Sequence, residues 1–67
     1  MAVAKVIELS ADSASSFEDA VRHGILRAND TVKNVRGAWV QDQEVVVKGG
    51  EIQIYRVHLK VTFVLEE

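Results

Sequence analysis

The chain has 67 residues and a mass of 7.4 kDa, which allows one small domain, residues 1–67, and excludes separate cofactor and substrate domains. Eight Lys and Arg against ten Asp and Glu give a net charge of -2, so no basic surplus favours nucleic acid, and the absence of Cys excludes disulfides and Cys-ligated metals. No apolar run is longer than four residues, far fewer than the ~20 of a membrane helix, and without a secretory signal pattern the chain is expected to be cytoplasmic.

The first segment, residues 3–9, has the length and the largely apolar composition of a strand. A Ser-rich stretch follows at residues 10–16, and such residues favour turns and helix caps. Ser15 with Glu18 three residues later fits a reciprocal capping box, and Ser13 is the alternative cap. The sequence therefore predicts that a helix begins here.

In the predicted helix, apolar residues recur every three or four positions, which indicates one buried stripe. The stripe consists of Phe17, Ala20, Val21, Gly24, Ile25, Ala28 and Val32. Gly24 costs roughly 1 kcal/mol of helix propensity relative to Ala. We therefore expect a neighbouring backbone to approach the helix closely at this glycine.

From residue 35 to 47 the pattern has a period of two, which predicts a second strand. One face carries Arg36, Ala38, Val40 and Asp42, and the other carries Gly37, Trp39, Gln41 and Gln43. Residues 48–51, Lys-Gly-Gly-Glu, suit a tight hairpin, and residues 55–65 alternate as a third strand. The order strand, helix, strand, strand predicts an α+β fold of the β-α-β-β type, with one sheet face against the helix.

Self-association is expected for two physical reasons. A third strand of ~14 residues extends to ~48 Å, whereas a compact globule of this length has a diameter of only ~28 Å. A single helix covers one sheet face, which leaves the face with Trp39, Arg56, His58 and Thr62 without intramolecular cover.

Three segments, together with the element order, resemble the dodecin family. They are KVIEL at residues 5–9, RANDTV at residues 27–32 and IYRVHLKVTFVLE at residues 54–66. The resemblance implies a three-stranded antiparallel sheet that wraps its helix, and a hollow homododecamer of cubic 23 symmetry. It also implies a flavin as the ligand, riboflavin or FMN, because many dodecins hold stacked flavin pairs between tryptophans at two-fold axes.

Within this resemblance, the family's stacking tryptophan falls at Gly37 and its flavin-binding glutamine falls at Arg56. Trp39 shares a strand face with Gly37 at a displacement of ~7 Å. We therefore assign four candidate flavin-binding residues: Trp39, Arg56, Gly37 and Gln41. Both departures resemble a subgroup of dodecins with calcium-binding members, so a flavin-free shell that binds calcium or another cation, or has a structural role, is the alternative.

No arrangement of catalytic residues is apparent, and we expect no enzyme. His23 and His58 lie 35 residues apart in the sequence, and neither has an adjacent carboxylate. We interpret the serines of residues 10–16 as turn and cap residues. Metal ligands stay unassigned, because one subunit supplies no complete set and a carboxylate such as Glu51 would act only when symmetry multiplies it. The sequence predicts a binding and storage protein whose partners are further copies of itself and a small aromatic ligand.

Overall fold

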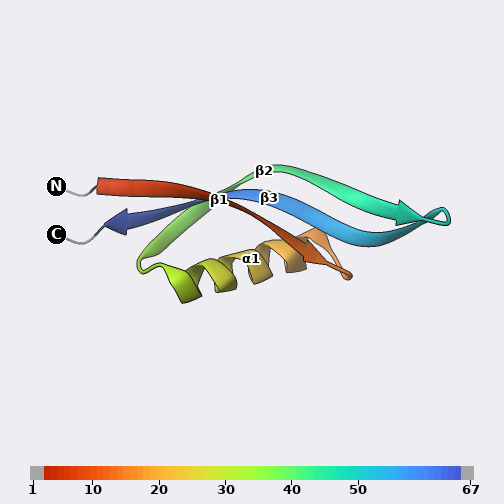
Figure 1. The fold of residues 1–67 in the computed structure, drawn as a ribbon, viewed down its shortest axis with the longest axis horizontal. Coiled ribbons are helices and arrows are strands. Elements are labelled where there is room, and N and C mark those ends of the chain that lie inside the picture. Colours follow the sequence, from red (N-terminus) through yellow and green to blue (C-terminus); the bar gives the residue numbers. More distant parts are fainter. Residues whose placement is uncertain (1–2, 66–67) are drawn as a thin grey trace.

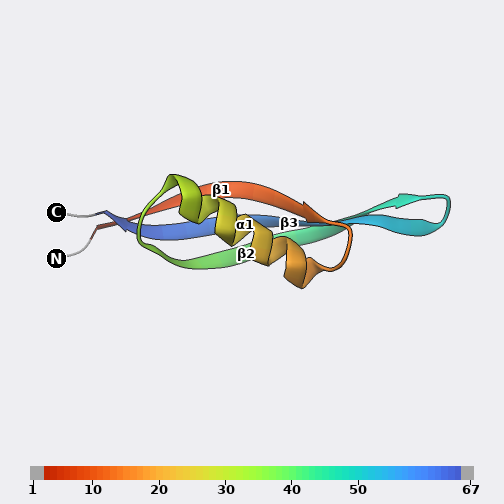
Figure 2. The same ribbon diagram turned by 90° about the horizontal axis from the view of Figure 1, so that it is seen from below.

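Three antiparallel strands and one helix make up residues 3–65, the part of the chain that this computed structural model describes. The elements are β1 (Val3–Ser13), α1 (Phe17–Thr31), β2 (Val35–Lys48) and β3 (Glu51–Leu65). β3 lies between β1 and β2, and α1 lies across one face of this sheet (Figures 1 and 2). The expected β-α-β-β fold is confirmed. No helix within residues 3–65 is long and apolar enough to cross a membrane.

The core lies between α1 and the inner face of the sheet, the face that the helix covers. Val57, Leu59 and Val61 alternate along β3 and are fully buried against Ala20 and Ala28 of the helix. Because side chains alternate across a strand, every second residue of β3 points to this core and the residues between point away from it. The central strand thus separates an apolar layer from a second surface.

Gly24 allows the helix to lie close to the sheet. A Cβ atom at this position would be 2.7 Å from Leu59 Cδ1 and 3.2 Å from Ala11 Cβ. The close approach expected at Gly24 is therefore present, although sheet side chains rather than a backbone make it. Phe17, at the start of the helix, packs its ring edge-on against Tyr55 with centroids 5.1 Å apart.

The helix begins one residue later than the predicted capping box requires. Ser16 is the N-cap, and its Oγ accepts a hydrogen bond of 3.0 Å from the backbone N–H of Asp19. Ser13, buried at the end of β1, accepts from the Ser15 N–H at 2.9 Å and donates to Asp19 Oδ2 at 2.7 Å. The predicted pairing of Ser15 with Glu18 was wrong, because the Ser13 hydroxyl already holds the Ser15 amide in the turn.

β2 contains an irregularity that changes which face its residues occupy. Val40 pairs with Leu59, and Asp42 pairs with the next residue of β3, His58, so Gln41 is an extra residue in a β-bulge. Beyond the bulge the alternation is inverted, and Asp42 lies on the face away from the helix. The predicted placement of Asp42 on the face of Val40 was therefore wrong, because a single inserted residue moves the side chains that follow it to the other face.

The molecule is elongated, with extents of 51 × 19 × 14 Å. Its radius of gyration is 13.7 Å, against ~11 Å for a compact chain of this length. The elongation comes from the β2–β3 hairpin, which projects beyond α1 and turns at Gly49 and Gly50 with positive φ angles of 62° and 78° (Figure 1). Val47 and Ile52 on this arm are about half exposed, so apolar surface on the arm has no cover within the chain.

Candidate functional site

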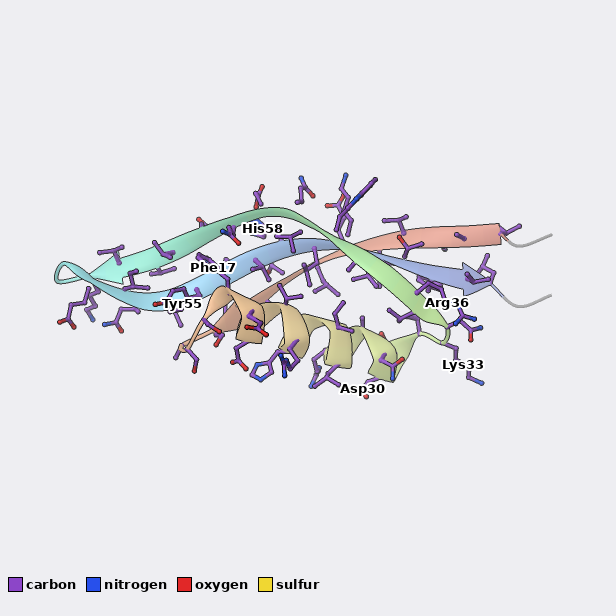
Figure 3. All side chains as sticks on the ribbon, turned by 180° about the vertical axis from the view of Figure 1, so that it is seen from behind. Phe17, Asp30, Lys33, Arg36, Tyr55 and His58 are labelled. Atoms are coloured by element: carbon purple, nitrogen blue, oxygen red, sulfur yellow. The ribbon has the colours of Figure 1, made fainter. Side chains whose placement is uncertain are left out.

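The outer face of the sheet, the face away from α1, carries the candidate site. It is organised in rows, each formed by one β3 residue and its register partners on β1 and β2. From the hairpin toward the termini the rows are Asp12–Arg56–Glu44, Ser10–His58–Asp42, Glu8–Lys60–Trp39 and Val6–Thr62–Gly37. Figure 3 shows His58 on this side of the sheet, with Asp30 on the opposite side at the helix.

Arg56 is held by a carboxylate from the neighbouring strand. Its Nε and Nη2 donate to the two carboxylate oxygens of Asp12 at 2.8 and 3.0 Å, and its Nη1 lies 3.7 Å from Glu44 Oε1. The hydrogen bond from Arg56 lowers the pKa of Asp12 below its ordinary value of 3.8, and the same bond raises the pKa of the guanidinium. Arg56 therefore uses two of its five N–H donors on Asp12, and any ligand at this position would share the guanidinium with that carboxylate.

His58 continues this group of charges along β3. Its Nδ1 contacts Asp42 Oδ1, and its Nε2 lies 3.7 Å from Glu44 Oε1. An imidazolium donates from both nitrogens, whereas the neutral ring carries one N–H. Asp12, Arg56, Glu44, His58 and Asp42 thus form a continuous charged network in which three carboxylates face one guanidinium and one imidazole.

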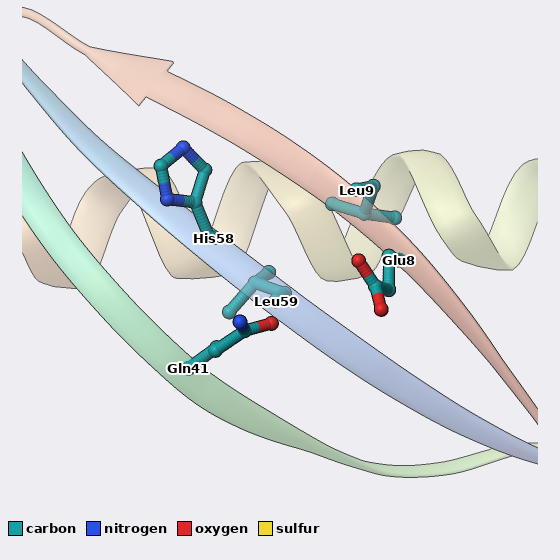
Figure 4. Close-up of a pocket in the computed structure, with 5 residues that line it drawn as sticks. All are labelled: Glu8, Leu9, Gln41, His58 and Leu59. Carbon is teal, nitrogen blue, oxygen red and sulfur yellow. The ribbon is translucent and has the colours of Figure 1, made fainter.

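A hollow of about 290 Å³ opens beside His58 (Figure 4). It is lined by Glu8, Leu9, Gln41, His58 and Leu59. Gln41, the extra residue of the β-bulge, comes from β2, and Glu8 comes from β1 on the other side of β3 (Figure 4). The polar side chains of Glu8, Gln41 and His58 distinguish this hollow from a second hollow on the same face, which is largely apolar.

The second hollow, of about 210 Å³, surrounds Trp39. Its other lining residues are Val6, Gly37, Ala38 and Thr62. The Trp39 side chain is 71% exposed, and a Cβ at Gly37 would meet no atom within 4 Å. An exposed indole beside an open, largely apolar surface is a place where a flat apolar group can be buried.

The structure brings together only part of the predicted set. Gly37 and Trp39 share the second hollow, Gln41 lines the first, and Arg56 lies two rows away from Trp39. Sequence reasoning missed Asp12, which was assigned to a turn. The alternation of polar and small residues continues after Leu9, and this pattern could have predicted that β1 extends as far as Asp12, the register partner of Arg56.

Within residues 3–65, no group of three or more His, Cys, Asp or Glu side chains is arranged to hold a metal ion in one chain. Two carboxylates of the charged network, Asp42 and Glu44, are nevertheless more than half exposed. A cation bound at these carboxylates would therefore need further oxygen ligands, from water or from another copy of the chain.

The dodecin family model matches residues 3–66. The chain belongs to the dodecin family. Calcium dodecin from Mycobacterium tuberculosis is 36% identical over 63 residues, which cover 94% of this chain and 89% of the relative. This comparison and the family model confirm the resemblance seen in the sequence.

Two solved dodecin structures differ in how they resemble this dodecin. The calcium-chelating calcium dodecin of M. tuberculosis is 37% identical, with a TM-score of 0.83 and coverage of 96% of this chain and 91% of that one. The dodecin of Streptomyces coelicolor is 27% identical but has a TM-score of 0.94, with coverage of 98% and 94%. Sequence likeness and backbone likeness thus point to different relatives.

Proposed function

We propose that this dodecin is a homododecameric binding and storage protein that takes a planar aromatic ligand of the flavin type at Trp39. The observation that carries the proposal is the 71% exposed indole beside the open surface at Gly37. Burying such a ring against a flat partner removes apolar area from water and satisfies the preferred geometry of aromatic pairs. The site binds its ligand without turnover, because no base and nucleophile are paired there.

The open shape of the Trp39 hollow favours assembly, because a single chain would leave a ligand in this hollow half uncovered. The hollow at Trp39 is open on the side away from the sheet, and the arm at Val47 and Ile52 exposes further apolar surface. A second copy packed on the outer face would close the hollow and could supply a second indole. Sedimentation at micromolar concentration should give a species near 89 kDa, twelve chains of 7.4 kDa, and a stable 7.4 kDa species would contradict the assembly.

Riboflavin fluorescence tests the ligand. Titration of the protein into riboflavin should quench the emission, and Trp39→Ala should weaken binding by ~5-fold to ~160-fold, the equivalent of ~1 to 3 kcal/mol for loss of one stacking partner. Trp39→Phe keeps a flat ring and should retain most of the affinity. Equal affinity in the Trp39→Ala variant would remove this residue from the site.

The polar edge of the ligand is assigned to Gln41 and Arg56. Gln41 offers both a donor and an acceptor, whereas Arg56 offers donors only. Since Arg56 is engaged by Asp12 at 2.8 Å, we expect Gln41 to contribute more. Gln41→Ala should therefore lower riboflavin affinity more than Arg56→Gln does, as measured in the same titration.

A calcium-binding shell is the second candidate. It is favoured by the 36% identical calcium dodecin and by the exposed carboxylates of Asp42 and Glu44. In an assembly, copies of these carboxylates could provide the six to eight oxygen ligands that calcium takes. Calorimetric titration with calcium chloride tests this function, which requires heat of binding that is lost in Asp42→Asn with Glu44→Gln and kept in Trp39→Ala.

A further inference from the structure

We propose that His58 and Glu44 form half of a binding site for a divalent metal ion that accepts nitrogen ligands, such as zinc, and that Asp42 orients the imidazole for this role. The inference goes beyond the proposed function, because a metal at these residues does not depend on a ligand at Trp39. It also differs from the calcium alternative, since it needs a nitrogen ligand. It is carried by the direction of one hydrogen bond, the spacing of two acceptor atoms and the local balance of charge.

The contact between His58 and Asp42 determines which ring nitrogen carries the proton when the imidazole is neutral. Nδ1 contacts Asp42 Oδ1, and an ionised carboxylate only accepts hydrogen bonds, so Nδ1 is the donor. A neutral imidazole has a single N–H, which leaves Nε2 with a free lone pair. Histidines that bind a metal through one nitrogen typically donate the other N–H to a carboxylate or carbonyl. His58 therefore has the arrangement of an oriented metal ligand.

The free nitrogen of His58 faces a second acceptor atom. Its Nε2 lies 3.7 Å from Glu44 Oε1, which is longer than a hydrogen bond of ~2.7–3.2 Å. With the neutral ring, both atoms present lone pairs to the space between them. Zinc binds nitrogen and carboxylate oxygen at ~2.0–2.2 Å, so two of its tetrahedral ligands lie ~3.4 Å apart. A movement of ~0.3 Å by the glutamate would therefore let one ion bind both atoms.

The charges around this pair favour a divalent cation. Three carboxylates, those of Asp12, Asp42 and Glu44, face the single guanidinium of Arg56. With a neutral imidazole the network therefore has an excess of two negative charges. Arg56 directs its short hydrogen bonds to Asp12, at 2.8 and 3.0 Å, and lies 3.7 Å from Glu44. Glu44 is thus less firmly held by the guanidinium and is the carboxylate that can move toward His58.

The site is open on the side away from the sheet. The His58 ring lies on the outer face, with the sheet between it and α1 (Figure 4). The side chains of His58 and Glu44 are 39% and 51% exposed. One chain would supply two of the four ligands of zinc, and water or a carboxylate of another copy would supply the rest. This fits the finding that no three such side chains converge within residues 3–65. We therefore expect reversible binding rather than a closed structural site.

The other histidine of the chain provides a matched control. His23 Nε2 also lies 3.7 Å from a carboxylate oxygen, Oδ1 of Asp19, on the surface of α1. No second carboxylate of the described residues lies within 4.0 Å of the His23 ring. The two histidines thus share the same spacing to one carboxylate and differ in the carboxylate that orients the ring. A comparison of the two separates an oriented site from general zinc binding by surface histidines.

Calorimetric titration of the assembled protein with zinc chloride tests the site. His58→Gln and Glu44→Gln should each weaken zinc binding by at least ~10-fold, because each removes a ligand atom. Asp42→Asn should weaken it by ~10-fold to ~100-fold, because the ring loses its charged hydrogen-bond partner. His23→Gln should change it by less than ~2-fold. In a parallel titration with calcium chloride, His58→Gln should have no effect on any heat of binding, since calcium takes oxygen ligands.

The protonation of the ring supplies a second test that needs no variant. In the metal-free native protein at about pH 8, ¹⁵N NMR of the imidazole should place the proton of His58 on Nδ1, and zinc should shift the Nε2 signal. If a variant does not assemble, as judged by sedimentation, this measurement carries the test. A proton on Nε2, zinc affinity that is unchanged in His58→Gln, or an equal loss in His23→Gln would overturn the inference. None of these results affects the proposal of a flavin-type ligand at Trp39.

Discussion

The two faces of β3 are built by the same strand and follow different rules. On the inner face, Val57, Leu59 and Val61 are fully buried, and their shapes must fit the helix. On the outer face, Arg56 contacts carboxylates of both neighbouring strands and His58 contacts two carboxylates of β2, while both side chains remain partly exposed. Buried apolar area stabilises strongly, whereas exposed ion pairs stabilise little. The inner face therefore maintains the fold, and the outer face is free to specify what the protein binds.

The largest expected effect on stability comes from a comparison of two adjacent residues of β3 that lie on opposite faces of the sheet. Leu59→Ala should destabilise the protein by about 3 kcal/mol, because a fully buried Leu is replaced by a cavity. Lys60→Ala should change the unfolding free energy by less than ~0.5 kcal/mol. Urea unfolding measures both, and equal losses would show that the outer face is as tightly packed as the inner one.

A methyl group added on the inner face should also be costly. Gly24→Ala gains up to ~1 kcal/mol of helix propensity but loses ~1–3 kcal/mol through crowding against Leu59 and Ala11, so we expect a net loss of about 1 kcal/mol. Shortening the crowded neighbour should relieve the strain. The double variant Gly24→Ala with Leu59→Val should therefore be less destabilised in urea than the sum of the single changes, and simple additivity would mean that the two side chains do not compete.

The same change from Gly to Ala on the outer face, at Gly37, should not lower the stability of the protein. Gly37→Ala meets no atom within 4 Å and needs no positive φ, so it should leave stability unchanged or raise it by ~0.5–1 kcal/mol. Riboflavin affinity should fall, since the methyl group enters the hollow at Trp39. Lower stability with unchanged affinity would place the function of Gly37 in subunit packing.

The smallest effect concerns the response of the outer face to acid. The pKa of Asp12 is lowered by Arg56, so the ionised carboxylate contributes stability above its ordinary pKa of 3.8, and this contribution is lost as the pH falls through the lowered value. Asp12→Asn should be less stable than the native protein at pH 7, and the difference should shrink below about pH 4. Urea midpoints across this range measure it, and a constant difference would mean that the charge of Asp12 contributes nothing.

The sequence was sufficient for the elements because hydrophobic periodicity reflects burial in one continuous core. The alternation along β3 predicts Val57 and Leu59 as inward residues, and the structure confirms it. The outer face was harder to predict. The bulge at Gln41 has no sequence pattern of its own, yet it moves Asp42 to the face of His58. The pairing of Arg56 with Asp12 joins residues 44 positions apart, and only strand register brings them together.

The strand order also constrains when the sheet can form as the chain is synthesised. Within residues 3–65, β1 and β2 pair only with β3, and β3 follows both of them in the chain. A ribosome adds ~5–20 residues each second, and β3 ends 52 residues after β1 does, at residue 65 against residue 13, so β1 waits about 3 to 10 s for its complete partner strand. Exposed backbone edges in that interval invite pairing with other nascent chains. A small protein with its central strand made last thus completes its sheet as a late, cooperative event after both flanking strands have been translated.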